Sequence, residues 1–393
     1  MASTLVINPG SSSKKYAFFD GVRPIAEYRF ERTAHGFEVC SVRDAGQQTC
    51  QSVNRAQYAS AITMVLELAR VQLAADALPA IVGIRIVAPG SYFQAHRVID
   101  DEFVKRLHDC MAVAPLHIPV MVAEIEAVRR ALPDTTIVAV SDSAFHSTLP
   151  PVARNYSIPA DLAQTHDVYR YGYHGLSVAS IVRRTHGVFG ADTPRLVVCH
   201  IGSGVSVTAV RDGVSVETTM GFSPGSGLVM GTRAGDVDAG ALLELMRAHH
   251  WRPLDAQTFL QTGGGLVGLT GEADIRSLLD RVAQRDASAI AALEVFRYHI
   301  ARAIAMSTAA LSGVDAVVLT ATAAERSPEL RAHVLGNLSY LGICVDAERN
   351  EQVASRDAII SPYDSPVKVA VMRTDELGEI VRVVSSQTWS LSS

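Results

Sequence analysis

The sequence predicts an α/β protein built from two related domains, and three observations support this prediction. An apolar strand, a small polar loop, a second strand and an Asp-Gly turn occupy residues 5–21 and recur at 197–213, with Gly10 and Gly202 among the matching pairs 192 positions apart. In both halves, helical patterns alternate with buried strands, which is typical of sheets covered by helices. A chain of 393 residues, 48% of them hydrophobic, can form two or three domains with sizeable cores.

The first half continues with alternating strands and helices. Apolar residues at helical spacing predict a helix over 57–73, and Pro119 suits the first turn of another over 119–132. A third helix is expected at 101–111. The further strands are expected at 25–30, 37–42, 81–87 and 136–140.

The second half repeats this order. Strands are expected at 195–199, 204–210, 214–218 and 316–320, with helices at 241–248 and 287–311. A strand over 367–373 is expected to lead into a C-terminal helix that returns to the first domain. The predicted domains are therefore 1–145, joined by 377–393, and 146–376.

The two repeated loops point to anion binding. Backbone N–H groups in Gly/Ser loops form nests for anions, and glycine lets an oxygen-rich ligand approach closely. Two such loops facing one cleft would suit a phosphoryl-bearing substrate. The alternative is that two unrelated hairpins share only their turn chemistry.

Composition restricts the other partners. A formal charge of −5 gives no reason to expect nucleic acid or an anionic membrane as a partner. The five cysteines are scattered without a C-x-x-C pair, which argues against a disulfide framework and a thiolate zinc site and fits a reducing cytoplasm. No secretory signal and no long apolar span are visible, so a cytoplasmic protein is expected.

Several segments together carry a resemblance to a known family. They are VINPGSSSKK (6–15), APLHIP (114–119), SDSAFH (141–146), RYGYHG (170–175), VCHIGSGVS (198–206), MGFSPGSGLVMGTRAGDVDAG (220–240) and GEADIRSLLD (271–280). These segments resemble the acetate kinase family, and the resemblance extends over nearly the whole chain. It implies the duplicated actin-like ATPase fold shared by acetate and sugar kinases, Hsp70 and actin (ribonuclease H-like), and a homodimer.

The resemblance also implies a catalytic set. Arg85 and Arg233 match the pair that holds the acyl substrate and the transferring phosphoryl group, and guanidinium groups bind oxyanions well. His174 matches the residue that binds phosphoryl oxygens at the transition state, and Asp142 a catalytic carboxylate. From the residues alone, Arg85 could equally be a strand-end arginine reaching solvent, and a lone histidine is more often structural.

The remaining implied site residues fall into three groups. Asn8 and Glu376 match metal-associated positions, and Asp142 with Glu376 would anchor Mg²⁺, with Mn²⁺ as an alternative. An apolar acyl pocket is implied at Val87, Leu116 and Pro224. Phosphate and nucleotide contacts are implied for Ser11, Ser13, Lys15, His200, Gly202, Ser203, Gly204, Asp274 and Arg276.

Three segments depart from the family pattern. Residues 88–90 read Ala-Pro-Gly where His-Gly-Gly is common, and Val205 brings bulk into the second loop. The largest departure is LTATAAER (319–326) in place of FTGGIGEN, where added Cβ atoms restrict left-handed backbone and fill space beside the nucleoside.

The sequence therefore predicts reversible, Mg²⁺-dependent phosphoryl transfer from ATP to the carboxylate of acetate or another short-chain acid, which forms an acyl phosphate. The altered 319–326 segment leaves a smaller donor such as pyrophosphate open. The alternatives are a propionate or butyrate kinase and a catalytically degenerate phosphate- or nucleotide-binding sensor or partner subunit.

Overall fold

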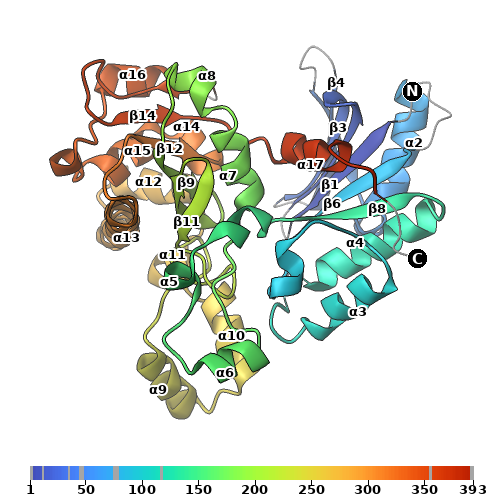
Figure 1. Ribbon diagram of the computed structural model, residues 1–393, viewed down its shortest axis with the longest axis horizontal. Coiled ribbons are helices and arrows are strands. Elements are labelled where there is room, and N and C mark those ends of the chain that lie inside the picture. Colours follow the sequence, from blue (N-terminus) through green and yellow to red (C-terminus); the bar gives the residue numbers. More distant parts are fainter. Residues whose placement is uncertain are drawn as a thin grey trace. The chain divides into compact units, whose positions relative to one another are not determined.

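Two mixed β-sheets organise the chain (Figure 1). The computed structural model describes residues 3–10, 13–33, 36–43, 48–73, 79–115, 118–353 and 356–389. Unit 1 consists of Met1–Ala144 and Asp375–Ser393, and unit 2 of Phe145–Thr374. This division places Glu376 in unit 1, whereas the sequence-based boundary left that residue in the second domain.

Unit 1 contains an eight-stranded sheet in the order β5-β4-β3-β2-β1-β6-β8-β7. The first five strands form an antiparallel meander, and β6 and β8 then run parallel to β1. The strands are β1 (Thr4–Pro9), β2 (Ser13–Asp20), β3 (Arg23–Thr33), β4 (Gly36–Arg43), β5 (Gln48–Val53), β6 (Ile81–Ile86), β7 (Arg97–Val98) and β8 (Thr136–Ser141).

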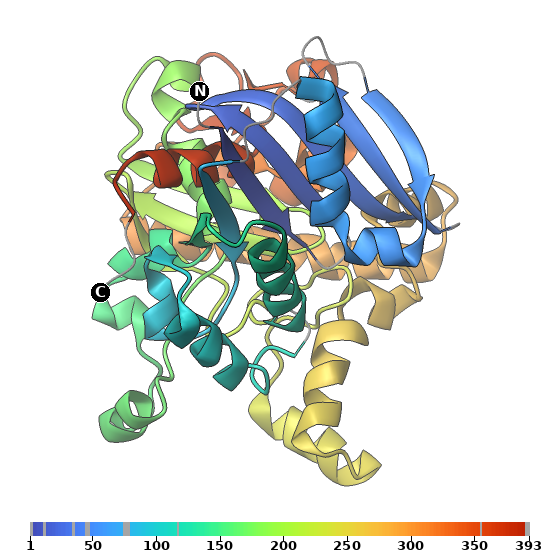
Figure 2. The ribbon, with the colours of Figure 1, turned by 90° about the vertical axis from the view of Figure 1, so that its right-hand side faces the viewer.

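Helices cover both faces of this sheet. Helices α2 and α4 pack on the face that carries Leu5 and Ile7, where they form the main core of unit 1 (Figure 2). Helix α17 lies on the other face, beside β1 and β6 (Figure 1); a Cβ at Gly83 would lie within 2.8 Å of its side chains, so glycine permits this close packing. The helices are α1 (Arg55–Ala59), α2 (Ala61–Leu73), η1 (Ser91–Gln94), α3 (Asp101–Asp109), α4 (Ile118–Ala131) and α17 (Glu376–Ser385).

Unit 2 contains a six-stranded sheet in the order β11-β10-β9-β12-β14-β13. The strands are β9 (Arg195–Ile201), β10 (Val205–Arg211), β11 (Val214–Thr218), β12 (Ala316–Thr320), β13 (Ala358–Ile359) and β14 (Lys368–Val371). Helix η2 (Ala144–Thr148) begins at the boundary. The other helices are α5 (Pro151–Arg154), α6 (Ala160–Thr165), α7 (Gly175–Val182), α8 (Thr185–Phe189), α9 (Ala239–His249), α10 (Pro253–Thr262), α11 (Gly265–Thr270), α12 (Ile275–Ala283), α13 (Ala287–Leu311), α14 (Thr322–Arg326), α15 (Pro328–Leu335), η3 (Ser339–Leu341) and α16 (Ala347–Gln352).

The two sheets repeat one topology. The order β3-β2-β1-β6-β8 in unit 1 corresponds to β11-β10-β9-β12-β14 in unit 2, with an antiparallel hairpin followed by parallel strands in both. Asn8 and His200 occupy the penultimate positions of β1 and β9. The face of β9 that carries Leu196 and Val198 packs against α7, and alternation places His200 on that same face. Duplication therefore extends from the sequence to the strand order.

Most predicted elements are present, with boundaries shifted by one or two residues. The helices expected at 287–311 and 119–132 and the strand at 316–320 coincide closely with α13, α4 and β12. The helix expected over 57–73 is instead interrupted at Ser60, and Asn54 caps its first segment. The prediction missed β5, because four polar residues in QTCQSV give no apolar run.

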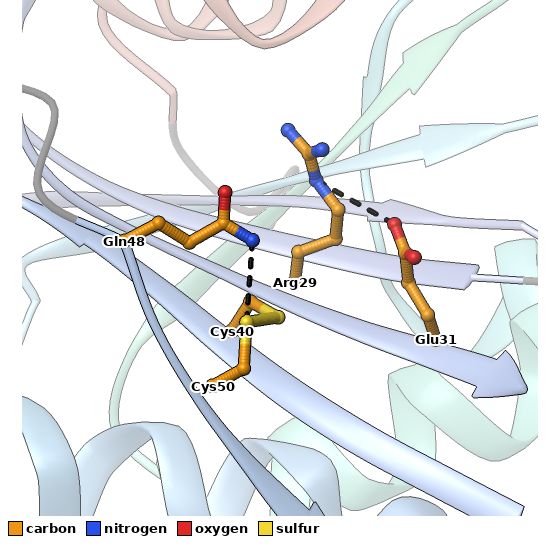
Figure 3. Close-up of a disulfide and its surroundings, with 5 residues drawn as sticks. All are labelled: Arg29, Glu31, Cys40, Gln48 and Cys50. Atoms are coloured by element: carbon orange, nitrogen blue, oxygen red, sulfur yellow. Dashed lines mark hydrogen bonds and ion pairs between the residues drawn. A yellow bond between two sulfur atoms is a disulfide. The ribbon is translucent and has the colours of Figure 1, made fainter.

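The scattered cysteines predicted that no disulfide framework is present, and this prediction is wrong for one pair. Cys40 and Cys50 face each other across β4 and β5 and form a disulfide (Figure 3). The Gln48 side-chain amide donates a hydrogen bond to Cys50 Sγ at 3.2 Å. Cross-strand register, which spacing alone did not reveal, brings these two cysteines together.

None of the helices in the described part of the chain is long and apolar enough to cross a membrane.

Candidate functional site

Four polar residues of unit 1 form a cluster at the carboxyl ends of its central strands. Asn8 lies near the end of β1, Arg85 lies on the adjacent β6, and Asp142 directly follows β8. Glu376 is the first residue of α17. Because the ends of parallel neighbouring strands meet at one edge of a sheet, these distant residues become neighbours. We call Asn8, Arg85, Asp142 and Glu376 the carboxylate cluster.

Arg85 is the centre of the carboxylate cluster. Its Nε and Nη2 donate to Oδ1 and Oδ2 of Asp142 at 3.1 and 2.9 Å, a bidentate geometry. Its Nη1 donates to Asn8 Oδ1 at 3.2 Å and lies 3.6 Å from Glu376 Oε2. Asn8 Nδ2 in turn donates to Glu376 Oε2 at 2.7 Å. The arginine is therefore held in one orientation by three side chains.

Burial and charge oppose each other at Arg85. Burial alone would lower the pKa of its guanidinium, but the Asp142 and Glu376 carboxylates outweigh this effect and raise the pKa above its ordinary value. The cation is thus permanent. Because Asp142 is fully buried, its bidentate pairing with Arg85 compensates for the loss of water contacts by both groups.

His96 supports the backbone that leads to Asp142. Its Nδ1 accepts a hydrogen bond from the Ser141 N–H at 3.0 Å, so this nitrogen carries no proton. Burial lowers the pKa of His96 to about 4, which keeps the ring neutral near pH 7. Sequence reasoning did not single out His96, because a lone histidine gives no positional signal.

The other predicted residues of unit 1 have varied surroundings. In the first loop, the Gly10 N–H donates to the Ser13 carbonyl at 2.8 Å, and Lys15 pairs with Asn8 across the β1–β2 ladder, which places both side chains on one face. Val87 is partly buried and packs against the core of unit 1. Ser11 and Leu116 lie outside the described residues.

The carboxylate cluster fits a magnesium ion better than a transition metal. Within the described ranges, no group of three or more His, Cys, Asp or Glu side chains is arranged to hold a metal. Mg²⁺ commonly uses one or two carboxylates together with phosphate oxygens and water, and so needs no such cage. Glu376 and Asn8 offer hard oxygens, and the buried Ser143 Oγ beside Asp142 has no hydrogen-bond partner among the described residues.

Unit 2 carries a second cluster, built around two stacked histidines. The imidazole rings of His174 and His200 lie 3.9 Å apart with an interplanar angle of 21°. His174 precedes α7 with φ +60°, a left-handed conformation uncommon outside glycine. Each Nδ1 has a serine partner: Ser206 Oγ at 2.9 Å from His174 and Ser177 Oγ at 2.8 Å from His200. We call these four residues the histidine cluster.

The predicted second loop lies against the histidine cluster. A Cβ at Gly204 would lie 3.0 Å from His174 Nε2 and 3.5 Å from Arg233 Nη1, so glycine lets an imidazole and a guanidinium approach the loop closely. Arg233 Nη1 donates to the Pro224 carbonyl at 2.9 Å. His200 Nε2 faces Gly202, whose Cβ would lie 3.6 Å away.

The adjoining residue Ser203 is exposed at the tip of this loop. The Gly202 N–H donates to the Gly204 carbonyl at 3.0 Å, which closes the turn around Ser203. Arg233, His174, His200 and the two glycines are thus neighbours in unit 2. The chemistry of this group, with two ring nitrogens and a cation around a glycine loop, suits the oxygens of a phosphoryl group.

The altered segment 319–326 keeps an unusual backbone. Ala321, between β12 and α14, has φ +72° and ψ 166°, a region that is normally restricted to glycine. Its N–H donates to Glu325 Oε1 at 2.9 Å. The preceding Thr320 pairs with His200 in the parallel ladder, and its fully buried hydroxyl has no hydrogen-bond partner within the described part of the chain. An unsatisfied buried hydroxyl next to His200 is consistent with a ligand at this edge.

Asp274 and Arg276 have a structural role at the start of α12. Asp274 caps this helix by accepting from the N–H groups of Arg276 and Ser277. Arg276 is 75% exposed and lies 3.5 Å from Asp274. Within the described residues, the hydrogen bonds and the ion pair of these two side chains lie at this helix cap rather than at the histidine cluster.

Comparisons with known proteins agree with these features. The sequence profile of the acetokinase family matches residues 3–382. An acetate kinase of Clostridium botulinum (strain Kyoto / Type A2) is 37% identical over 382 residues, covering 95% of this chain and 96% of that protein.

Solved structures give the same result for the fold. The crystal structure of Porphyromonas gingivalis acetate kinase matches with a TM-score of 0.85 and 28% identity, covering 98% of this chain and 99% of that chain. A propionate kinase from Francisella tularensis subsp. tularensis SCHU S4 matches with a TM-score of 0.88 and 28% identity, covering 97% and 98%. The two mixed sheets thus have the duplicated actin-like fold, and the chain belongs to the acetokinase family.

Proposed function

We propose that this protein catalyses reversible phosphoryl transfer between ATP and the carboxylate of a short-chain acid, which forms an acyl phosphate. Membership of the acetokinase family carries the proposal, since relatives of both the acetate and the propionate kinase type match nearly the whole chain. The chemistry of the two clusters supports it. A carboxylate nucleophile is already ionised near neutral pH, so no general base is required.

In this proposal the histidine cluster and Arg233 bind the oxygens of the transferring phosphoryl group. Charge on these oxygens is neutralised by fixed donors, which is the main contribution a protein makes to phosphoryl transfer. Nε2 of His174 lies beside Gly204 and Nε2 of His200 beside Gly202, where each would donate to a phosphoryl oxygen. The Arg233 guanidinium also lies beside Gly204 and would donate to the same group. Thr320 supplies a further hydroxyl beside His200.

The carboxylate cluster is proposed to bind the acid and the metal. Arg85 presents a permanent cation for a carboxylate or phosphoryl oxygen, and Asp142 orients it. Glu376 and Asn8 would hold Mg²⁺, which neutralises phosphate charge when bound. The apolar acyl pocket implied at Val87, Leu116 and Pro224 stays a prediction.

The experiment is a hydroxamate assay for acyl phosphate with purified protein and MgCl₂. ATP and pyrophosphate are compared as donors against acetate, propionate and butyrate. ATP-dependent formation of an acyl hydroxamate supports the proposal, and the best acid defines the chain length. Folded protein that is inactive with every pair would favour a binding protein without catalysis. A homodimer in the cytoplasm is the accompanying expectation, and sedimentation velocity tests the dimer.

A further inference from the structure

A series of hydrogen-bonded polar groups, some buried and some half-buried, joins the histidine cluster to the 319–326 segment. Ser177 Oγ lies 2.8 Å from His200 Nδ1 and accepts a hydrogen bond from the Thr374 hydroxyl at 2.9 Å. The Thr374 N–H donates to Glu325 Oε1 at 3.0 Å, and the same oxygen accepts from the Ala321 N–H at 2.9 Å. All five residues belong to unit 2.

The hydrogen bonds of Ser177 indicate which ring nitrogen of His200 carries a proton. Ser177 is fully buried and has one hydroxyl proton. Since Thr374 donates to Ser177 Oγ, the Ser177 proton is available for His200 Nδ1. If Nδ1 carried a proton instead, Ser177 would accept from both sides and its own buried O–H would have no acceptor, at a cost of about 1–3 kcal/mol. The network therefore favours a bare Nδ1 and a proton on Nε2.

The stacked neighbour favours a neutral His200 as well. Two imidazolium ions about 4 Å apart would repel by roughly 4 kcal/mol at an effective dielectric constant near 20. The His174 and His200 rings are 3.9 Å apart, so two positive charges on this pair would be unfavourable. Because Nδ1 of His200 accepts from Ser177, His200 can donate from Nε2 without that charge.

We propose that Ser177 and Thr374 are positioning residues that hold His200 as the neutral Nε2–H tautomer, ready to donate to a phosphoryl oxygen. One carboxylate oxygen of Glu325 accepts hydrogen bonds from the N–H groups of both Thr374 and Ala321. The positions of the Thr374 and Ser177 hydroxyls therefore depend on the 319–326 segment. The inference rests on the proposed phosphotransfer for its substrate, but the tautomer itself is a property of the free protein.

The test combines NMR of the full chain, labelled with ¹⁵N-histidine, with steady-state kinetics. The His200 signals are assigned from their loss in His200→Gln. Thr374→Val removes the hydroxyl at nearly constant shape, Thr374→Ser keeps it, and Ser177→Ala removes the direct partner. The matched control is Thr308→Val, since the buried Thr308 hydroxyl donates to a carbonyl of its own helix.

The expected wild-type spectrum shows protonated Nε2 and unprotonated Nδ1 for His200. Thr374→Val and Ser177→Ala should shift His200 toward a tautomer mixture and lower kcat about tenfold at unchanged KM for the acid, while Thr374→Ser and Thr308→Val should resemble the wild type. A proton on Nδ1 in the wild type, or an unchanged tautomer in both Thr374→Val and Ser177→Ala, would overturn the inference. A wild-type protein with the expected tautomer but without acyl phosphate formation would instead refute the proposed function.

Discussion

Asp142 binds Arg85 through both of its carboxylate oxygens, and it does so from a fully buried position. Sequence reasoning assigned Asp142 to a magnesium ion together with Glu376. The geometry instead directs its two oxygens to the guanidinium, while Glu376 contacts Asn8 and lies within 3.6 Å of Arg85. Asp142 is thereby well placed to orient Arg85, and Glu376 is the carboxylate better placed for a metal.

Replacing Asp142 with asparagine should destabilise unit 1 as well as lower activity. The change removes the carboxylate that pairs with the buried guanidinium of Arg85. The free energy of unfolding should therefore fall by about 3 kcal/mol. Urea unfolding measures this loss. Asp101→Asn is the matched control: its ion pair with Arg129 is at the surface and should contribute less than about 1 kcal/mol. Equal losses of unfolding free energy in the two variants would show that the buried Asp142–Arg85 pair stabilises the protein no more than the surface pair.

Ala321→Gly should stabilise the protein. Ala321 has φ +72° and ψ 166°, where a Cβ costs on the order of 1–3 kcal/mol, and glycine relieves this strain. We expect a gain of about 1 kcal/mol after the extra chain entropy of glycine is subtracted. Thermal unfolding of Ala321→Gly and of Ala323→Gly, inside α14, gives the comparison. The latter should lose up to about 1 kcal/mol, and a loss in both variants would contradict the strain at Ala321.

His96 should make stability depend on acid pH. Burial lowers its pKa to about 4 in the folded chain, against about 6.5 when unfolded. Between these values the unfolded chain binds more protons, so stability falls as the pH drops from about 6.5 to about 4, by about 2 kcal/mol for this partly exposed ring. His96→Gln keeps an acceptor for the Ser141 N–H and should flatten this dependence in urea unfolding curves. His186→Gln, at an exposed position, is the control and should leave the pH dependence of the unfolding free energy unchanged. An equally steep pH dependence in His96→Gln would show that His96 does not cause it.

Reduction of the Cys40–Cys50 disulfide should weaken unit 1. The bridge closes a segment with a sequence separation of 10, which corresponds to about 2–3 kcal/mol of restricted unfolded-state entropy. Dithiothreitol should therefore lower the unfolding midpoint of the wild type. Cys50→Ser should show no further effect of the reductant. Cys110→Ser, which changes a cysteine of the same unit outside the disulfide, should respond like the wild type. A wild type insensitive to complete reduction would contradict the prediction.

Much of the fold could be predicted because its signals are local. The long helix α13 and the strand β12 carry uninterrupted helical or apolar patterns, and the 192-residue repeat predicted the matching strand orders. The edge strand β5 and the disulfide could not be predicted, since a polar edge strand has no apolar run and its register depends on a neighbouring strand.

The sequence singled out the main residues of the carboxylate cluster but not the residues that support the histidine cluster. Arg85, Asp142 and Glu376 lie together because Arg85 lies near the end of β6, Asp142 follows β8 and Glu376 begins α17. Their roles stay predictions. Ser177, Thr374 and Glu325 gave no signal as single residues. Their arrangement depends on hydrogen bonds between segments almost 200 residues apart, which periodicity and composition cannot reveal.

The most direct test of the proposed phosphotransfer is the turnover of Arg233→Ala in the hydroxamate assay. Arg233 lies beside His174 and Gly204 in the proposed phosphoryl site. Arg247→Ala, at an exposed ion pair of α9, is the control. We expect the wild type and the control to form acyl phosphate from ATP, with a loss of kcat of at least about 10²-fold in Arg233→Ala and an unchanged unfolding midpoint. Near-wild-type turnover of Arg233→Ala would contradict the account.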